Sequence, residues 1–194
     1  MLKVAITGNM GSGKTTVCSI FKILSIPVFN ADEAAAYELE HNSEVVRAVK
    51  SLCGEDIYNN GKADRQRIAS QVFNSPEKLQ ALNAVSHPAT IEHFKRWLKK
   101  QDAPYIIKEA AILFESGTDI GIDKIITVTA PEIIRIERIR KRNPQWTDEQ
   151  IQRRLKSQMA EDEKIKRSHF VINNDDTQSL IEQVLHIHQE LISK

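Results

Sequence analysis

The strongest constraint on this chain is a glycine-rich segment close to its first residue. The run Gly8-Asn9-Met10-Gly11-Ser12-Gly13-Lys14-Thr15 matches the pattern G-x-x-x-x-G-K-[ST]. In such a loop the backbone N–H groups surround phosphate oxygens, the lysine reaches the β- and γ-phosphates, and the final hydroxyl can bind Mg²⁺. The helix that follows points its positive dipole end at the same anion. The predicted ATP-phosphate contacts are Gly11, Ser12, Gly13, Lys14, Thr15 and Thr16, with Thr15 as the metal ligand.

The residues around this loop predict an α/β fold. Short apolar runs typical of buried strands occupy residues 2–7, 26–30, 105–108, 124–129 and 170–173. Apolar residues recur at helical spacing after the loop and again over residues 180–192. Strands that alternate with helices indicate a parallel sheet covered on both faces. We therefore expect one domain over residues 1–194 with a five-stranded parallel sheet.

Two stretches depart from the simple alternation. Residues 33–100 contain helical patterns and no convincing strand, with Ser43 and Ser75 as expected N-caps and Pro76 at a first helical position. Residues 131–166 are helical and basic, and a break at residues 143–146 precedes a capping box that starts at Thr147. We interpret the first stretch as a helical insertion and the second as a mobile lid.

Composition excludes several classes of protein. The formal net charge is only +1, which argues against a general nucleic-acid or membrane-surface binder. No window approaches the roughly 20 apolar residues of a membrane span, and the first residues do not form a signal peptide. Cys18 and Cys53 have neither metal-ligand nor redox spacing. A soluble cytoplasmic protein is the expectation, and the sequence sets no oligomeric state.

Asp32 is the candidate catalytic base. It follows the second predicted strand, and ligands of open α/β sheets bind at the carboxyl ends of strands. Phosphoryl transfer to a hydroxyl benefits from a carboxylate that orients the hydroxyl and takes its proton. Capping of the next helix is an equally good explanation of Asp32 from the sequence alone, and the two roles are compatible.

Arg138 and Arg142 lie four residues apart on one helical face of the basic stretch. Arginine in a closing lid can neutralise charge on a transferred phosphoryl group. A solvated basic face is the alternative. Residues 109–111, Glu-Ala-Ala, lack the Asp-x-x-Gly of GTPases, and no Asn-Lys-x-Asp segment follows. A small-molecule kinase is therefore favoured over a nucleotide-binding regulatory module, and other acceptors such as a nucleoside, a nucleotide or a shikimate-like alcohol stay open.

Over nearly its whole length the chain resembles the dephospho-coenzyme A kinase family. The matching segments are the phosphate loop, Asn30-Ala31-Asp32, Asp64-Arg65-Gln66-Arg67-Ile68, Val72-Phe73, His87-Pro88, Ile112-Leu113-Phe114-Glu115, Arg138, Arg142, Gln158, Glu161-Asp162-Glu163-Lys164 and Val171-Ile172-Asn173-Asn174. The resemblance implies transfer of the γ-phosphate of ATP, with Mg²⁺, to the ribose 3′-hydroxyl of dephospho-coenzyme A. It implies an acceptor-binding insertion at 33–100 and a lid at 131–166.

The resemblance also implies the roles of single residues. It makes Asp32, Lys14 and Arg138 catalytic, and Arg138, Arg142 and Asn173 contacts of ATP. The implied acceptor contacts are Thr7, Asp32, Arg65 and His87. The chain departs from the family pattern at Asn30, Ala111, His169 and Asp176. No catalytic part is therefore expected of Asn30.

Overall fold

The computed structural model describes residues 1–72 and 75–193, and the chain divides into two compact units. One unit joins Met1–Asn30 to Gln101–Lys194, and the other is Ala31–Lys100. The second unit begins two residues before the predicted insertion and ends at the same residue. Phe73, part of one resembling segment, lies outside the described residues.

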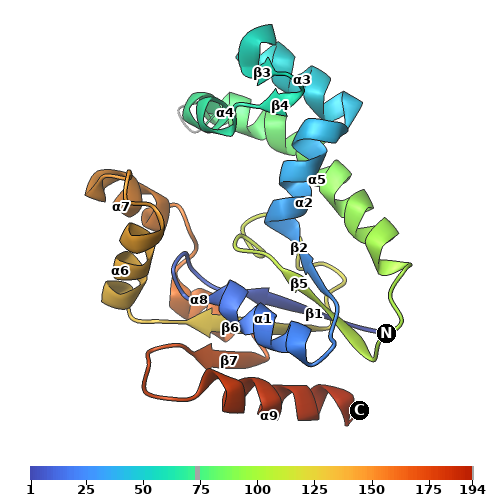
Figure 1. The fold of residues 1–194 in the computed structure, drawn as a ribbon, viewed down its shortest axis with the longest axis vertical. Helices are drawn as coiled ribbons and strands as arrows, with labels where there is room; N and C mark the ends of the chain where they lie inside the picture. The colour runs from blue at the N-terminus through green and yellow to red at the C-terminus, as the bar shows by residue number, and fades with distance from the viewer. Residues whose placement is uncertain (73–74, 194) are drawn as a thin grey trace. The chain divides into compact units, whose positions relative to one another are not determined.

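A five-stranded parallel sheet forms the centre of the first unit, in the order β2-β5-β1-β6-β7 (Figure 1). Its strands are β1 (Leu2–Thr7), β2 (Val28–Asn30), β5 (Tyr105–Glu109), β6 (Lys124–Thr129) and β7 (Phe170–Asn173). The predicted sheet is thus confirmed. Strand β2 starts two residues later than expected, because the N–H of Ile26 is bonded to Phe21 at the end of the preceding helix and Pro27 has none.

The core explains why most residues of these strands are apolar. Helices α1 (Lys14–Ile23) and α9 (Leu180–Ile192) lie side by side along the sheet in Figure 1, and they pack against alternate strand residues such as Val4, Ile6 and Ile107. Residues of the opposite face, such as Ile106 and Thr127, are also fully buried. A parallel sheet covered on both faces requires this continuous apolar pattern.

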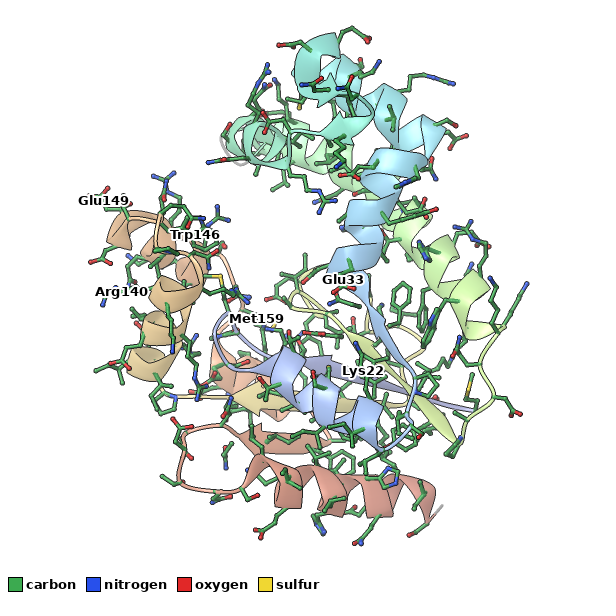
Figure 2. All side chains as sticks on the ribbon, viewed as in Figure 1. Lys22, Glu33, Arg140, Trp146, Glu149 and Met159 are labelled. Atoms are coloured by element: carbon green, nitrogen blue, oxygen red, sulfur yellow. The ribbon has the colours of Figure 1, made fainter. Side chains whose placement is uncertain are left out.

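The predicted lid contains three helices: α6 (Glu132–Arg142), α7 (Asp148–Lys156) and α8 (Glu161–Lys166). The capping box at the start of α7 is confirmed, since Thr147 and Gln150 exchange backbone and side-chain hydrogen bonds. Trp146, which Figure 2 labels, lies in the break before α7. The guanidinium of Arg154, a residue of α7, lies 4.3 Å from the centre of its ring. That contact gives Trp146 a packing role within the predicted lid.

The described residues of the second unit form four helices and a small hairpin. The helices are α2 (Ala31–His41), α3 (Ser43–Cys53), α4 (Arg65–Val72) and α5 (Pro76–Leu98), with a short 3₁₀ turn η1 (Glu55–Ile57) after α3. Its own apolar cluster centres on Val49, Ile57 and Ile68. Ser75 caps α5 as expected, and Pro76 occupies the first position. Within the described residues, no helix is long and apolar enough to cross a membrane.

Two expectations for this unit were wrong. It does contain strands, β3 (Tyr58–Asn59) and β4 (Lys62–Ala63), which pair as an antiparallel hairpin. Asn60 and Gly61 form its turn with φ of 49° and 78°, the left-handed conformations that an Asn-Gly turn favours. The cap of α3 is Asn42 and not Ser43, because the Asn42 carboxamide accepts the N–H groups of Glu44 and Val45.

We expect Phe21→Ala to lower the free energy of unfolding by about 3–5 kcal/mol, since Phe21 is fully buried and truncation leaves a cavity. Ile23→Ala on the same helix is the control, because Ile23 is 81% exposed, and we expect a change within about 0.5 kcal/mol. Denaturant unfolding monitored by circular dichroism measures both. Equal losses in the two variants would contradict the placement of α1 on the sheet.

Candidate active site

The phosphate loop connects β1 to α1 and depends on glycine at its last turn. Gly13 is the N-cap of α1 and has a φ of 96°, which side-chain-bearing residues rarely adopt. A Cβ at this position would also collide with the carboxamide of Asn174. That carboxamide donates a hydrogen bond of 2.7 Å to the backbone carbonyl of Ser12. Glycine thus permits both the turn and the approach of a distant segment.

The ammonium group of Lys14 folds back over the loop. It donates to the carbonyl oxygens of Gly8 at 2.9 Å and Asn9 at 3.3 Å. These carbonyls hold a positive charge at the loop that the sequence predicts to bind phosphate. A lysine held in this way can exchange a carbonyl for a phosphate oxygen without a large movement of its side chain.

The interior of the loop contains polar atoms without partners in the described part of the chain. The hydroxyls of Thr7 and Ser12 and the carboxamide oxygen of Asn9 are buried and make no hydrogen bond there. Burying an unpaired polar atom costs about 1–3 kcal/mol. Three such atoms around one loop indicate a segment shaped for a polar ligand. Thr7 itself is fully buried, so its predicted contact with the acceptor stays a prediction.

Thr15 and Glu109 form a pair of oxygen ligands suited to Mg²⁺. The hydroxyl of Thr15 donates to Glu109 Oε1 at 2.8 Å, and Asn30 Nδ2 lies 3.5 Å from Glu109 Oε2. Among the described residues no group of three acidic, histidine or cysteine side chains could hold a metal. Mg²⁺ at kinase sites takes one or two protein oxygens and completes its shell with phosphate and water, so this small set fits.

Glu109 is a functional candidate that the sequence interpretation missed. It lies at the carboxyl end of β5, beside Ile6 of β1, and its side chain is buried. The thiol of Cys18 lies beneath it, and burial together with this carboxylate raises the pKa of that thiol. An acidic residue directly after a buried strand was the available signal. The sequence interpretation used this segment only to exclude a GTPase.

Arg138 bridges α6 to the segment after β7. Its guanidinium donates to the carbonyl of Asn174 at 3.2 Å and forms an ion pair with Asp176 at 3.3 Å. Asn174 in turn contacts Ser12 of the phosphate loop. Asn174 therefore links the guanidinium of Arg138 to the phosphate loop through two hydrogen bonds. Asn174, which gives this link, was not among the predicted site residues.

The other predicted nucleotide contacts are arranged differently. Arg142 is the exposed last residue of α6, and its side chain has no hydrogen bond or ion pair within residues 1–72 and 75–193. The side chain of Asn173 accepts a hydrogen bond from Thr129, and its backbone pairs with Gln183. Nucleotide contacts by these two residues stay predictions.

Three predicted residues belong to the second unit. Asp32 lies in the first turn of α2, two residues after β2 ends. The guanidinium of Arg65 forms an ion pair of 2.8 Å with Glu40 of α2. His87 lies inside α5, directly before Pro88. The juxtaposition of Asp32 with the phosphate loop stays a prediction.

The second unit also has a polar hollow of about 480 Å³, lined by α2, the start of α3 and Arg96. Beside it the carboxylate of Glu38 is almost fully buried and accepts hydrogen bonds from Asn42, His93 and Arg96. None of the predicted acceptor contacts lines this hollow. The Glu38 cluster joins α2 to α5 and is a structural element of the unit.

Comparison with known sequences gives a consistent result. The profile of the family described as Dephospho-CoA kinase matches residues 2–179. A dephospho-CoA kinase of Bacteroides fragilis is 35% identical over 187 residues, 96% of this chain and 91% of the relative. One from Chlorobaculum tepidum is 37% identical over 201 residues, 99% of this chain and 96% of the relative.

Solved structures agree with the sequence matches. A protein from Thermus thermophilus superimposes with a TM-score of 0.87 at 31% identity, covering 97% of this chain and 96% of the other. A dephospho-CoA kinase from Campylobacter jejuni gives 0.70 at 25% identity, covering 98% and 97%. A shikimate kinase from Bacteroides thetaiotaomicron gives 0.53 at 15% identity over 100% and 99%, a likeness of fold alone. With the family profile spanning nearly every residue and relatives above 30% identity, this chain belongs to the dephospho-CoA kinase family.

Proposed function

We propose that the protein transfers the γ-phosphate of ATP to the ribose 3′-hydroxyl of dephospho-coenzyme A. The products are coenzyme A and ADP, and the reaction is the last step of coenzyme A biosynthesis. The observation that carries the proposal is the phosphate loop, with Lys14 above it and unpaired polar atoms within it, in a chain of this family. We also expect a cytoplasmic enzyme that acts on these small molecules and not on nucleic acid.

The first unit supplies the nucleotide side of the reaction. Backbone N–H groups of the loop and the ammonium of Lys14 hold the phosphates and disperse the charge that builds on the transferred group. Thr15 and Glu109 are the residues that would hold Mg²⁺, which neutralises phosphate charge when it is bound. Arg138 stabilises the same charge from the lid side, and Arg142 adds a second guanidinium.

The second unit supplies the acceptor side. Asp32 takes the proton of the 3′-hydroxyl as its oxygen forms a bond to the γ-phosphorus and the bond to the bridging oxygen of ADP breaks. Arg65 binds an anionic group of the acceptor, for which it exchanges its ion pair with Glu40. His87 donates a hydrogen bond nearby. Arg138 and Arg142 of α6 close over the nucleotide and exclude water, which suppresses hydrolysis of ATP.

The first experiment measures transfer of labelled γ-phosphate from Mg·ATP to dephospho-coenzyme A, against shikimate, nucleosides and nucleotides as rival acceptors. We expect labelled coenzyme A as the preferred product, and little phosphate release without acceptor. Preferred transfer to another acceptor would refute the proposed substrate. ATP binding with no transfer to any acceptor would favour a regulatory module.

For Asp32→Asn we expect kcat to fall by roughly 10²-fold or more, as for a lost general base, with the Kd for Mg·ATP unchanged. Glu33→Gln is the matched control, since it removes a carboxylate one residue away in the same helical turn. Steady-state kinetics and calorimetric titration measure the two quantities. Turnover close to wild type in Asp32→Asn would leave this residue only the role of helix N-terminal stabilisation.

For Lys14→Ala we expect transfer to be lost, because the transferred phosphate no longer has its positioning charge. The same assay at saturating acceptor measures this. Unchanged turnover would contradict the assignment of the phosphate loop.

For Glu109→Gln we expect the Mg²⁺ concentration at half-maximal rate to rise about tenfold, since one negative charge beside the metal is lost while Thr15 keeps its hydrogen-bond acceptor. Activity is measured over a range of Mg²⁺ at fixed ATP. Asp123→Asn, which removes an exposed carboxylate bonded to the N–H of Lys3, is the control. An unchanged Mg²⁺ dependence would exclude Glu109 from the metal site.

A further inference from the structure

The linker between α7 and α8, residues 157–160, is attached to the phosphate loop. Gln158 Oε1 accepts a hydrogen bond of 2.8 Å from the backbone N–H of Met10, one of the variable residues of the loop. Both side chains are partly buried. The Met10 amide therefore has its acceptor in the protein and does not depend on a ligand. The carbonyl groups of Gly8 and Asn9, by contrast, are engaged by Lys14 from within the loop itself.

The linker is itself held by hydrogen bonds to other residues of the first unit. The N–H of Met159, which Figure 2 labels at the foot of the lid, donates to Glu115 Oε1 at 2.9 Å. Lys164 of α8 is fully buried and forms an ion pair of 2.9 Å with the same oxygen, while also donating to the carbonyl of Ala111. Breaking a buried pair of this kind is costly, so the linker is held in place.

The ionisation of Glu115 supports this attachment. Burial alone would raise the pKa of this carboxyl group, but the hydrogen bonds from Lys164 and from the Met159 N–H outweigh burial and lower the pKa below its usual range. The carboxylate is therefore charged at neutral pH. A charged acceptor makes both hydrogen bonds stronger than neutral ones would be.

The other end of the lid also meets the loop. Helix α6 starts after β6, and its Arg135 is buried with Nε bonded to the carbonyl of Ala130. A Cβ on Gly11 would lie only 2.6 Å from the carbonyl oxygen of Arg135. The start of the lid is thus in close contact with Gly11, and the end of the lid is bonded to its neighbour Met10.

From this arrangement we propose that Gln158 is a positioning residue for phosphoryl transfer, which couples the lid to the phosphate loop through the Met10 amide. This role rests on the proposed phosphotransferase function, because Gln158 sets the loop conformation that binds the nucleotide. Gln158 touches no reacting atom in this role. Its loss leaves the Met10 N–H without an acceptor and allows the loop to move away from the geometry that binds phosphate.

The test compares Gln158→Met with Gln158→Glu. Methionine has a similar shape but no strong acceptor, and we expect the Kd for Mg·ATP and the KM for ATP to rise about tenfold, with the KM for dephospho-coenzyme A unchanged. Glutamate keeps an acceptor at the same distance, and we expect it to restore affinity to within about threefold of wild type. Gln189→Met, an exposed glutamine on α9, is the control for the chemical change.

Wild-type affinity for Mg·ATP in Gln158→Met would overturn the proposal, as would a glutamate variant no better than the methionine variant. A parallel rise in both KM values together with a lower Tm would mean general destabilisation, and would also overturn a positioning role. The Kd for Mg·ATP is measured by calorimetry without acceptor. An unchanged Kd in this titration therefore speaks only against the role of Gln158. An error in the proposed acceptor is detected only by the transfer assay.

Discussion

The phosphate loop must keep backbone N–H groups available for a ligand, so its shape has to be held by groups outside it. Within the loop a backbone turn hydrogen bond joins the Ser12 N–H to the carbonyl of Asn9. Asn174 holds the carbonyl of Ser12, and Gln158 holds the N–H of Met10. These supports come from residues more than 140 positions along the chain. The sheet brings them together, since β6 leads into the predicted lid, and β7 into the segment after it, at the edge where β1 ends.

The carboxyl edge of the sheet also explains one departure from the family pattern. Asn30 ends β2 directly beside Glu109 of β5, and its amide nitrogen lies 3.5 Å from the carboxylate. An aspartate in this place would bring a second negative charge against a buried carboxylate, at a cost that rises as water is excluded. The neutral amide donates a hydrogen bond instead. Asn30, which the resemblance leaves without a role, thus orients a candidate metal-site residue.

Local signals in the sequence were sufficient for the sheet, the phosphate loop and the capping box at Thr147, because each is encoded within a few neighbouring residues. The Asn60-Gly61 hairpin was missed although its turn is also local, since its strands are only two residues long and show no alternation. The pairings of Glu109, Asn174 and Gln158 with residues of the phosphate loop were beyond local reasoning. Each residue acts through a partner far away in the chain, and only the folded sheet establishes those pairs. The placement of Arg65 and His87 at the acceptor rests on the resemblance, and that of Asp32 also on its position after the second strand.

The second unit occupies a single crossover between two neighbouring strands, leaving the sheet after β2 and returning before β5. It has its own apolar cluster, separate from the core beneath α1 and α9. The two units can therefore change in sequence with little effect on each other's core. Substitutions that reshape the cluster within Ala31–Lys100 can leave the packing beneath α1 and α9 unchanged.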